Sequence, residues 1–244
     1  MNDKNNYIDI HSHIMPGIDD GATDMNQTFR MLQIAVSEHI MTIIATPHYI
    51  CGRHNPDPGF LGELKDRVQE LARSINKDLK VYLGNEIYYS DSVIGDLKKG
   101  KALTLAGSRY VLVEFSPEER FNAIYHGIGE LIRHGYMPIL AHTERYVCLY
   151  RNNNLISELV KAGCYIQINC RSVMGGRFSR KAAYIRWLVD EGLVHFLGSD
   201  SHRDDIRPPI METAVRQLVK RCDTEKVGRI IYENPLKVIE NIYI

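Results

Sequence analysis

The sequence has no net charge and no long hydrophobic segment. Lysine plus arginine number 30 and aspartate plus glutamate number 30, so the formal net charge is zero. A protein that coats nucleic acid needs a strongly basic surface, which this composition disfavours. No run approaches the roughly 18 apolar residues of a membrane-spanning helix, and the polar N-terminus lacks the apolar core of a signal peptide. We therefore expect a cytoplasmic protein with no nucleic-acid partner and no membrane insertion.

Cysteine is scarce and irregularly placed. The five cysteines are odd in number and form no Cys-x-x-Cys pair. Such a set suits reduced thiols better than a disulfide framework. No cysteine is followed by an arginine six residues later, so the Cys-x5-Arg loop of cysteine-dependent tyrosine phosphatases is missing. A phosphatase mechanism based on a cysteine nucleophile is therefore excluded.

Three further motifs are absent or incomplete. The chain has no Gly-x-Gly-x-x-Gly fingerprint and no Gly-x-Ser-x-Gly elbow, so neither a dinucleotide-binding fold nor a serine hydrolase is supported. Gly95–Lys101 mimics a nucleotide-binding loop, but Ala102 replaces the hydroxyl residue that binds magnesium, and no strand runs directly into Gly95. We interpret this segment as a basic turn.

Seven short apolar runs are spread along the chain. Each is too short for a helix and is typical of a buried strand. Amphipathic stretches lie between them, with the spacing that βαβ units require. The predicted strands are Tyr7–Ile10, Thr42–Ala45, Lys80–Leu83, Tyr110–Val113, Met137–Ala141, Cys164–Ile168 and Val194–Gly198. The predicted helices cover about 25–40, 60–76, 119–133, 154–162 and 178–191, and closing helices follow residue 208.

This alternation predicts a parallel α/β barrel of about seven strands. At 244 residues the chain has the size of such barrels, which commonly run to about 250 residues as one unit. The sequence shows no internal repeat, low-complexity tract or linker. We therefore expect a single domain over residues 1–244.

The predicted strands end in side chains that bind metals. The pair His11 and His13 follows the first run, and Asp200 and His202 follow the last. Because alternate residues of a strand point to the same side, each pair can reach one centre. Catalytic groups of α/β barrels lie at these carboxyl ends. The candidate ligands are His11, His13, Asp20, His48, Glu86, Glu114, His142, Asp200 and His202.

Each candidate also has a plainer interpretation. A single histidine such as His48 or His142 is more often a capping or core residue than a ligand. A glutamate at a strand end can be solvated or can cap a helix, and either Asp19 or Asp20 can start the helix that follows. The joint occurrence of all these residues favours a metal site. Five histidines are set aside, although His54 is placed where it could touch a substrate: His39, His54, His126, His134 and His195.

The donor set indicates the chemistry. Five imidazoles and four carboxylates exceed the needs of one mononuclear site, so two or three ions are expected. Mixed nitrogen and oxygen donors suit manganese, iron or zinc. Clustered divalent ions activate water and neutralise a phosphoryl group, so hydrolysis of a phosphate ester fits best. Arg145 and Arg207 follow strand ends and can complete a phosphate clamp. Weaker candidates for this clamp are Arg53, Arg171 and Arg177.

Taken together, these motifs resemble the PHP (polymerase and histidinol phosphatase) superfamily. They are most similar to the manganese-dependent protein-tyrosine phosphatases of bacterial capsule and exopolysaccharide loci. The resemblance rests on Asp9–His13, Ile18–Ala22, Ala45–His48, Gly84–Glu86, Glu114, Ala141–Arg145 and Gly198–His202. It implies a distorted (β/α)7 barrel that holds three manganese ions.

The resemblance also implies a role for each residue. His11, His13, Glu86 and Asp200 would hold one ion; Glu86, Glu114 and His142 a second; Asp20, His48 and His202 a third. Arg145 and Arg207 would bind the phosphate. The implied substrate is the phosphotyrosine tail of a bacterial tyrosine kinase that regulates capsular or exopolysaccharide synthesis. Tyrosines near the motifs are candidates to pack on the substrate ring: Tyr49, Tyr88, Tyr89 and Tyr146.

Two alternatives stay open. The same site suits a small-molecule phosphatase such as histidinol phosphatase. A non-catalytic binding module with structural metals is the other, although structural zinc sites are usually closed by four ligands. The segments 50–62, which resembles a lid, and 171–177 match no motif of the family.

Overall fold

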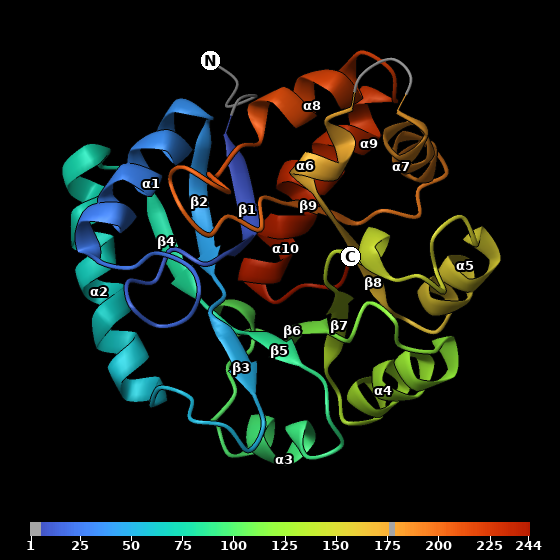
Figure 1. The fold of residues 1–244 in the computed structure, drawn as a ribbon, viewed down its shortest axis with the longest axis horizontal. Helices are drawn as coiled ribbons and strands as arrows, with labels where there is room; N and C mark the ends of the chain where they lie inside the picture. Colours follow the sequence, from blue (N-terminus) through green and yellow to red (C-terminus); the bar gives the residue numbers. More distant parts are fainter. Residues whose placement is uncertain (1–5, 176–178) are drawn as a thin grey trace.

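The computed structural model describes residues 6–175 and 179–244. Within them, parallel strands and helices alternate over most of the chain up to β9, and only helices follow (Figure 1). The strands are β1 (Tyr7–Ser12), β2 (Ile40–Ala45), β3 (His48–Ile50), β4 (Lys80–Leu83), β5 (Glu86–Tyr88), β6 (Tyr110–Glu114), β7 (Met137–Leu140), β8 (Tyr165–Asn169) and β9 (Phe196–Gly198). All seven predicted apolar runs are therefore strands. The two additional strands, β3 and β5, are short and begin with polar residues.

The additional strands continue two of the predicted ones. β2 pairs with β4. After a short break that separates β2 from β3 and β4 from β5, β3 pairs with β5. Across this break the Gly84 amide donates to the Ala45 carbonyl at 2.8 Å, and the Glu86 amide donates to the Pro47 carbonyl at 3.2 Å. The Pro47 nitrogen cannot donate a hydrogen bond, which explains why the ladder is interrupted there. The described strands thus occupy seven positions.

These seven positions form a closed ring. The hydrogen-bonded orders are β1-β2-β4 and β3-β5-β6-β7-β8-β9. The residues that follow β9 pair with β1: the Asp200 amide donates to the His11 carbonyl at 2.8 Å, and the His13 amide donates to the Ser201 carbonyl at 2.7 Å. The prediction of a parallel α/β barrel of about seven strands is confirmed. The expectation of one domain over residues 1–244 stays a prediction.

Helices surround the ring. They are α1 (Met25–Ser37), α2 (Pro58–Ile75), α3 (Val93–Lys98), α4 (Phe121–Arg133), α5 (Asn153–Lys161), α6 (Cys170–Val173), α7 (Arg180–Asp190), α8 (Glu212–Val219), α9 (Thr224–Gly228) and α10 (Asn234–Glu240), with single turns at Leu105–Gly107 and Thr143–Arg145 and a π-helical turn at Arg229–Glu233. Asp24 caps α1 by accepting from the Gln27 amide. The predicted helices are confirmed, including those after residue 208.

Three predictions about segments need correction. Gly95–Lys98, expected to be part of a basic turn, belongs to α3, and only the following residues turn. Arg171 lies in the short helix α6 rather than in a loop, while Arg177 lies outside the described residues. His195, expected inside a strand, directly precedes β9. Helices of four to six residues carry too little periodicity to be seen in sequence.

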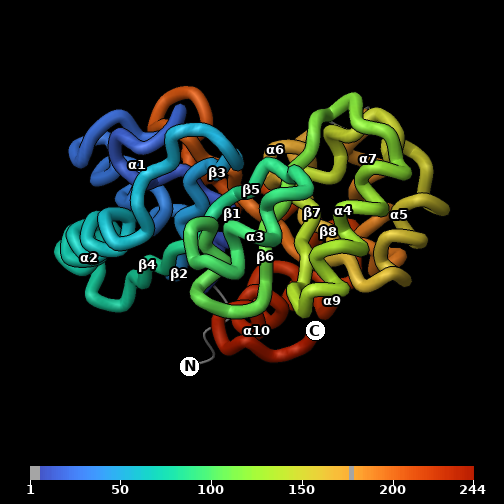
Figure 2. The backbone as a smooth tube through the Cα atoms, turned by 90° about the horizontal axis from the view of Figure 1, so that it is seen from below, coloured from blue at the N-terminus to red at the C-terminus, as the bar shows by residue number. Residues whose placement is uncertain are grey.

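The interior of the ring is apolar at its amino end. Side chains from β1, β2, β6, β7 and β9 form a buried cluster that includes Ile10, Ile44, Leu112, Ile139 and Phe196. Val238 of α10 packs against this cluster, so α10 closes that end of the ring. Figure 2 shows α10 at one edge of the molecule, away from β3. A larger cluster fills the space between the strands and the outer helices.

None of the helices in residues 6–175 and 179–244 is both long and apolar enough to cross a membrane.

Candidate metal centre

A bulge in β1 directs two histidines into the ring. Asp9 pairs with Ile43 and Ser12 with Ala45, so β1 contains one residue more than β2 between these pairs. An extra residue reverses the alternation of side chains. Ile10 therefore joins the apolar interior cluster, while His11 and His13 beyond it face the polar end of the same interior. The expectation that the two imidazoles share one side is met, with their ring nitrogens Nε2 3.3 Å apart.

Two other candidate ligands have strained backbones. His142 has φ of 33° and Asp200 has φ of 51°, both in the left-handed region that residues with a side chain rarely adopt. Such conformations cost roughly 1–3 kcal/mol each and cluster at functional sites. His142 follows β7 and Asp200 follows β9, so the strain lies at the carboxyl end of the ring.

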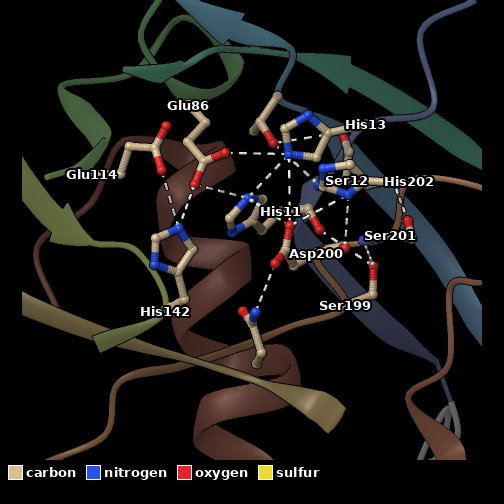
Figure 3. Close-up of polar contacts among 12 residues, drawn as sticks. His11, Ser12, His13, Glu86, Glu114, His142, Ser199, Asp200, Ser201 and His202 are labelled. Carbon is tan, nitrogen blue, oxygen red and sulfur yellow. Dashed lines mark hydrogen bonds and ion pairs between the residues drawn. The ribbon is translucent and has the colours of Figure 1, made fainter. Parts of the chain in front are cut away.

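Glu86 lies at the middle of the cluster. Its oxygen Oε1 is 3.2 Å from His11 Nε2 and 2.9 Å from His142 Nε2, and its Oε2 is 3.2 Å from His13 Nε2. Figure 3 shows these histidines arranged around the Glu86 carboxylate. Glu114 lies beside it, with Oε2 3.3 Å from His142 Nε2. Strands β1, β5 and β6 and the segment that follows β7 thus contribute to one cluster.

The remaining candidates extend this cluster in two directions. Asp200 Oδ1 lies 3.5 Å from His11 Nε2 and 3.7 Å from His13 Nε2. Asp20, which is more exposed than the others, has its Oδ1 3.6 Å from His48 Nε2 and 3.4 Å from His202 Nε2. The structure therefore brings all nine predicted ligands together.

The spacing of the ligand atoms fits bound cations. Atoms that each lie about 2.0–2.2 Å from one cation are roughly 3–3.5 Å from each other, and most separations in the cluster fall near this range. Three sets of ligand atoms lie close enough together to share an ion: His11, His13 and Asp200; His48, Glu86 and Glu114; His13, Asp20, His48 and His202. His48 can serve two sets, because its Nδ1 is 3.2 Å from both Glu86 and Glu114 while its Nε2 faces Asp20.

The ionised carboxylates of the cluster are stabilised by nearby positive charge. Burial opposes protonation of His13, but its hydrogen bonds to the Asp19 and Glu86 carboxylates raise its pKa to about 10. Burial opposes ionisation of Asp200, yet the charge of His11 together with that of Arg145 lowers its pKa to about 2. Buried carboxylates are thus held ionised by cationic neighbours. Divalent cations supply that charge when the imidazoles act as neutral ligands.

Residues around the cluster hold the candidate ligands in place, and the sequence did not reveal this supporting role. Asp19 accepts a hydrogen bond from His13 Nδ1 at 2.8 Å and another from the His48 amide at 3.1 Å. Neither Asp19 nor Asp20 starts α1, since Asp24 caps that helix. On β8, Gln167 Oε1 lies 3.3 Å from His11 Nδ1 and accepts from the His142 amide at 2.7 Å. The sequence feature that could have identified Gln167 is its position as a polar residue inside the apolar run Cys164–Ile168.

The two predicted arginines converge on Asp200. Arg145 Nη2 lies 2.5 Å and Arg207 Nη1 3.3 Å from Asp200 Oδ2, the oxygen that points away from the histidines. Both side chains are partly exposed. Arg171 donates instead to the Ile206 carbonyl at 2.6 Å, so it supports the segment that carries Arg207 rather than facing the cluster. Arg53 lies in the loop after β3.

Two of the four tyrosines expected near the substrate are buried. Tyr49 and Tyr146 are 5% and 0% exposed, and they form hydrogen bonds with Asp96 and the Phe115 amide. Tyr89 stacks on Phe115. Tyr49, Tyr89 and Tyr146 therefore support the fold. The expectation that a tyrosine packs on the substrate ring is wrong for Tyr49 and Tyr146, because their side chains are buried. Tyr88 is 38% exposed, and it points to the same side of β5 as Glu86 because the two residues alternate.

All five cysteines lie within the described residues and are free. None belongs to the cluster of candidate ligands. Cys164 and Cys170 are fully buried, and burial raises the pKa of both thiols, which makes them poor nucleophiles.

Comparison with known families decides the relationship of this chain. Residues 7–240 match the family described as capsular polysaccharide synthesis, CpsB/CapC. The chain belongs to the CpsB/CapC family.

Individual members of this family support the assignment. The chain is 33% identical to "Tyrosine-protein phosphatase CpsB" of Streptococcus pneumoniae, covering 95% of this chain and 98% of that protein. It is 34% identical to "Tyrosine-protein phosphatase YwqE" of Bacillus subtilis, covering 96% of this chain and 92% of the relative. Among solved structures, it resembles one described under "Crystal structures of YwqE from Bacillus subtilis and CpsB from Streptococcus pneumoniae, unique metal-dependent tyrosine phosphatases", with a TM-score of 0.86, 32% identity and coverage of 97% of this chain and 96% of that chain.

Proposed function

We propose that this CpsB/CapC family member is a metal-dependent protein-tyrosine phosphatase. The observation that carries the proposal is the convergence of nine residues with nitrogen or oxygen donors and two arginines at the carboxyl end of the ring. Its full-length similarity to tyrosine-protein phosphatases supports the same activity. The substrate we propose is phosphotyrosine on a bacterial tyrosine kinase that regulates capsular or exopolysaccharide synthesis.

We assign the nine clustered residues to three divalent ions, with manganese as the preferred metal and iron or zinc as alternatives. The ligands are His11, His13, Asp20, His48, Glu86, Glu114, His142, Asp200 and His202. When bound, such ions activate a water molecule and neutralise charge on the phosphoryl group. Asp19 and Gln167 orient the imidazoles of His13 and His11, as outer partners of metal-binding histidines commonly do.

In this proposal Arg145 and Arg207 bind the phosphate. Each guanidinium now faces the outer oxygen of Asp200, beside the ligands, and each is exposed enough to reach an incoming anion. A planar fork holds two phosphate oxygens at once and stabilises the charge that they carry in the transition state. The leaving phenolate has a pKa of about 10, far below that of an alkoxide, so its departure depends little on a general acid.

Its five free thiols suit a reducing compartment, which supports the proposal that the enzyme works in the cytoplasm.

The test measures phosphate release from a phosphotyrosine peptide and from histidinol phosphate by manganese-loaded protein, before and after chelation. The proposal expects the peptide to be hydrolysed with the higher kcat/KM, expects chelation to abolish activity and expects manganese to restore it. A tenfold or greater preference for histidinol phosphate would replace the proposal with a small-molecule phosphatase. Absence of turnover with every phosphate ester would favour a binding module with structural metals.

A further inference from the structure

A groove of about 880 Å³ lies beside the candidate metal centre. The loop after β3, the first turn of α2, the end of α3 and the turn at residues 17–18 form its walls. In Figure 1, α3 lies next to the end of β3, where the chain leaves for α2. This groove includes most of the segment 50–62 and Lys101 at the end of the basic turn, two features that match no part of the proposed mechanism.

Strand β3 separates the groove from the metal centre. His48 faces the Glu86 and Glu114 carboxylates, while its neighbour Tyr49 points to the opposite side and lines the groove. The opposite wall begins at Gly17 and Ile18, directly before Asp19, which binds the His48 amide at 3.1 Å. A peptide whose phosphotyrosine lies at the metal centre can therefore extend over β3 into this groove.

The groove carries cations without partners. Arg53 and Lys101 line it and are exposed, and neither forms an ion pair with any residue that the structure describes. Lys98, which ends α3, and Lys99, in the turn that leads to Lys101, also have no such pair among the described residues. Exposed cations of this kind remain available to an incoming anion.

The two acidic residues of the groove, Asp57 and Asp96, accept hydrogen bonds from neutral groups of the fold and keep their charge. Asp57 caps α2 by accepting from the Gly59 amide at 2.8 Å. One oxygen of Asp96 accepts from the Tyr49 hydroxyl at 2.9 Å and from the Cys51 thiol at 2.8 Å. The Phe60 side chain, 52% exposed, adds an apolar surface beside the cations. This combination suits an anionic side chain next to an apolar or aromatic group.

We propose that this groove binds an anionic side chain of the substrate peptide, close in sequence to the phosphotyrosine that is hydrolysed. The proposal rests on the proposed phosphatase function and adds a determinant of peptide preference to it. The anion can be a carboxylate or a second phosphate ester, since both match ammonium and guanidinium groups. An uncharged flanking residue gains nothing there.

Four substrates separate these possibilities. Three are peptides of equal length with one hydrolysable phosphotyrosine, flanked by neutral residues, by glutamates or by a second phosphotyrosine with a non-hydrolysable phosphonate. The fourth is p-nitrophenyl phosphate, which has no peptide and cannot reach the groove. Wild-type enzyme is expected to have a lower KM for the two anionic peptides than for the neutral one. The glutamate and phosphonate arms show which anion is preferred, and the advantage should shrink as salt rises.

The test variant is Lys101→Glu, and its matched control is Lys77→Glu. Lys77 is also an exposed lysine but precedes β4, at the opposite end of the ring, so both variants change the net charge equally. Lys101→Glu is expected to raise KM for the anionic peptides roughly three- to tenfold, with kcat, the neutral peptide and p-nitrophenyl phosphate little changed. Lys77→Glu should behave as wild type. Lys101→Met provides a milder second variant if the charge reversal impairs folding.

Three outcomes decide the matter. Loss of the anionic preference in Lys101→Glu and Lys101→Met, but not in Lys77→Glu, supports the groove. Equal KM values of the wild-type enzyme for neutral and anionic peptides, or an unchanged preference in both Lys101 variants, overturns it while the phosphatase function stands. Failure of the wild-type enzyme to hydrolyse any of the four substrates overturns the phosphatase function itself, and the groove proposal with it.

Discussion

The two ends of the strand ring contain opposite kinds of side chains. At the amino end, Ile10, Ile139 and Phe196 are fully buried among apolar neighbours and closed off by α10. At the carboxyl end, the same strands or the residues after them place histidines and carboxylates in contact, with strained backbone at His142 and Asp200. One end therefore stabilises the fold, and the other stores strain and charge for chemistry, as barrel enzymes commonly divide these tasks.

Histidines show the same contrast. His13 at the carboxyl end is buried against carboxylates, which raise its pKa to about 10 despite burial. For His195 at the amino end burial is the one cause of the shift, and it lowers the pKa to about 4. Burial alone thus keeps a histidine neutral, whereas the carboxylates around His13 supply negative charge that suits cations.

The largest expected effect is the loss of a central ligand. Glu86→Gln keeps the shape of the side chain but removes the charge that four histidines face. We expect kcat/KM for phosphotyrosine peptide to fall by more than the roughly 10- to 100-fold typical of losing an outer partner of a metal ligand. Metal content, measured by elemental analysis, should fall as well. Unchanged metal content in a folded variant would contradict the assignment of Glu86.

The arginines should affect catalysis more than metal binding. Arg145→Lys and Arg207→Lys keep the charge but lose the planar fork. By analogy with the loss of one preorganised oxyanion donor, kcat should fall roughly 10- to 1,000-fold, with metal content preserved. Steady-state kinetics and elemental analysis on the same preparations provide the measurement. Wild-type kinetics in both variants would show that these residues have no part in phosphate binding.

A change at the amino end should produce the reverse pattern. Ile139→Ala removes a fully buried side chain from the apolar cluster and should lower the free energy of unfolding by about 2–5 kcal/mol. Denaturant unfolding measures this loss. Activity per folded molecule should change little at temperatures well below the melting point. A large loss of kcat with unchanged stability would break the division between the two ends.

His195 gives a smaller, pH-dependent effect. Its folded pKa of about 4 lies below the unfolded value of 6.5, so protons favour the unfolded state. The stability linked to His195 is present above pH 6.5 and is lost as pH falls towards 4, by at most about 3 kcal/mol. His195→Gln should flatten this part of the curve, because an amide oxygen can still accept from the Ile166 amide. Denaturant unfolding of metal-free protein between pH 7 and 4.5 tests it, and parallel curves for the two proteins would refute it.

Much of the fold was accessible from sequence. Runs such as Lys80–Leu83 coincide with strands because apolar, β-rich segments bounded by turns have few other conformations. The strands β3 and β5 were not predicted, because each has only three residues. They begin with His48 and Glu86, polar residues that indicate a functional site rather than a strand. The bulge at Asp9–Ser12 is equally invisible, since it depends on register with β2.

The candidate site shows a similar limit. Its ligand types and order along the chain were predictable because each follows an apolar run. Adjacent acids such as Asp19 and Asp20 cannot be separated by pattern, since their difference lies in which way a tight turn directs each side chain. The burial of Tyr49 and Tyr146 also depends on tertiary packing. Sequence therefore indicated the residues that cluster as candidate ligands better than the residues that position them.

The most direct test of the central claim is a titration of metal-free protein with manganese while phosphotyrosine hydrolysis is measured. The nine clustered ligands predict that activity is absent without metal, rises with added manganese and saturates near three ions per chain. Glu86→Gln should saturate at fewer ions and remain nearly inactive. Full activity of the metal-free protein, or full activity with no dependence on bound manganese, would contradict the claim that this cluster is a metal-dependent phosphatase site.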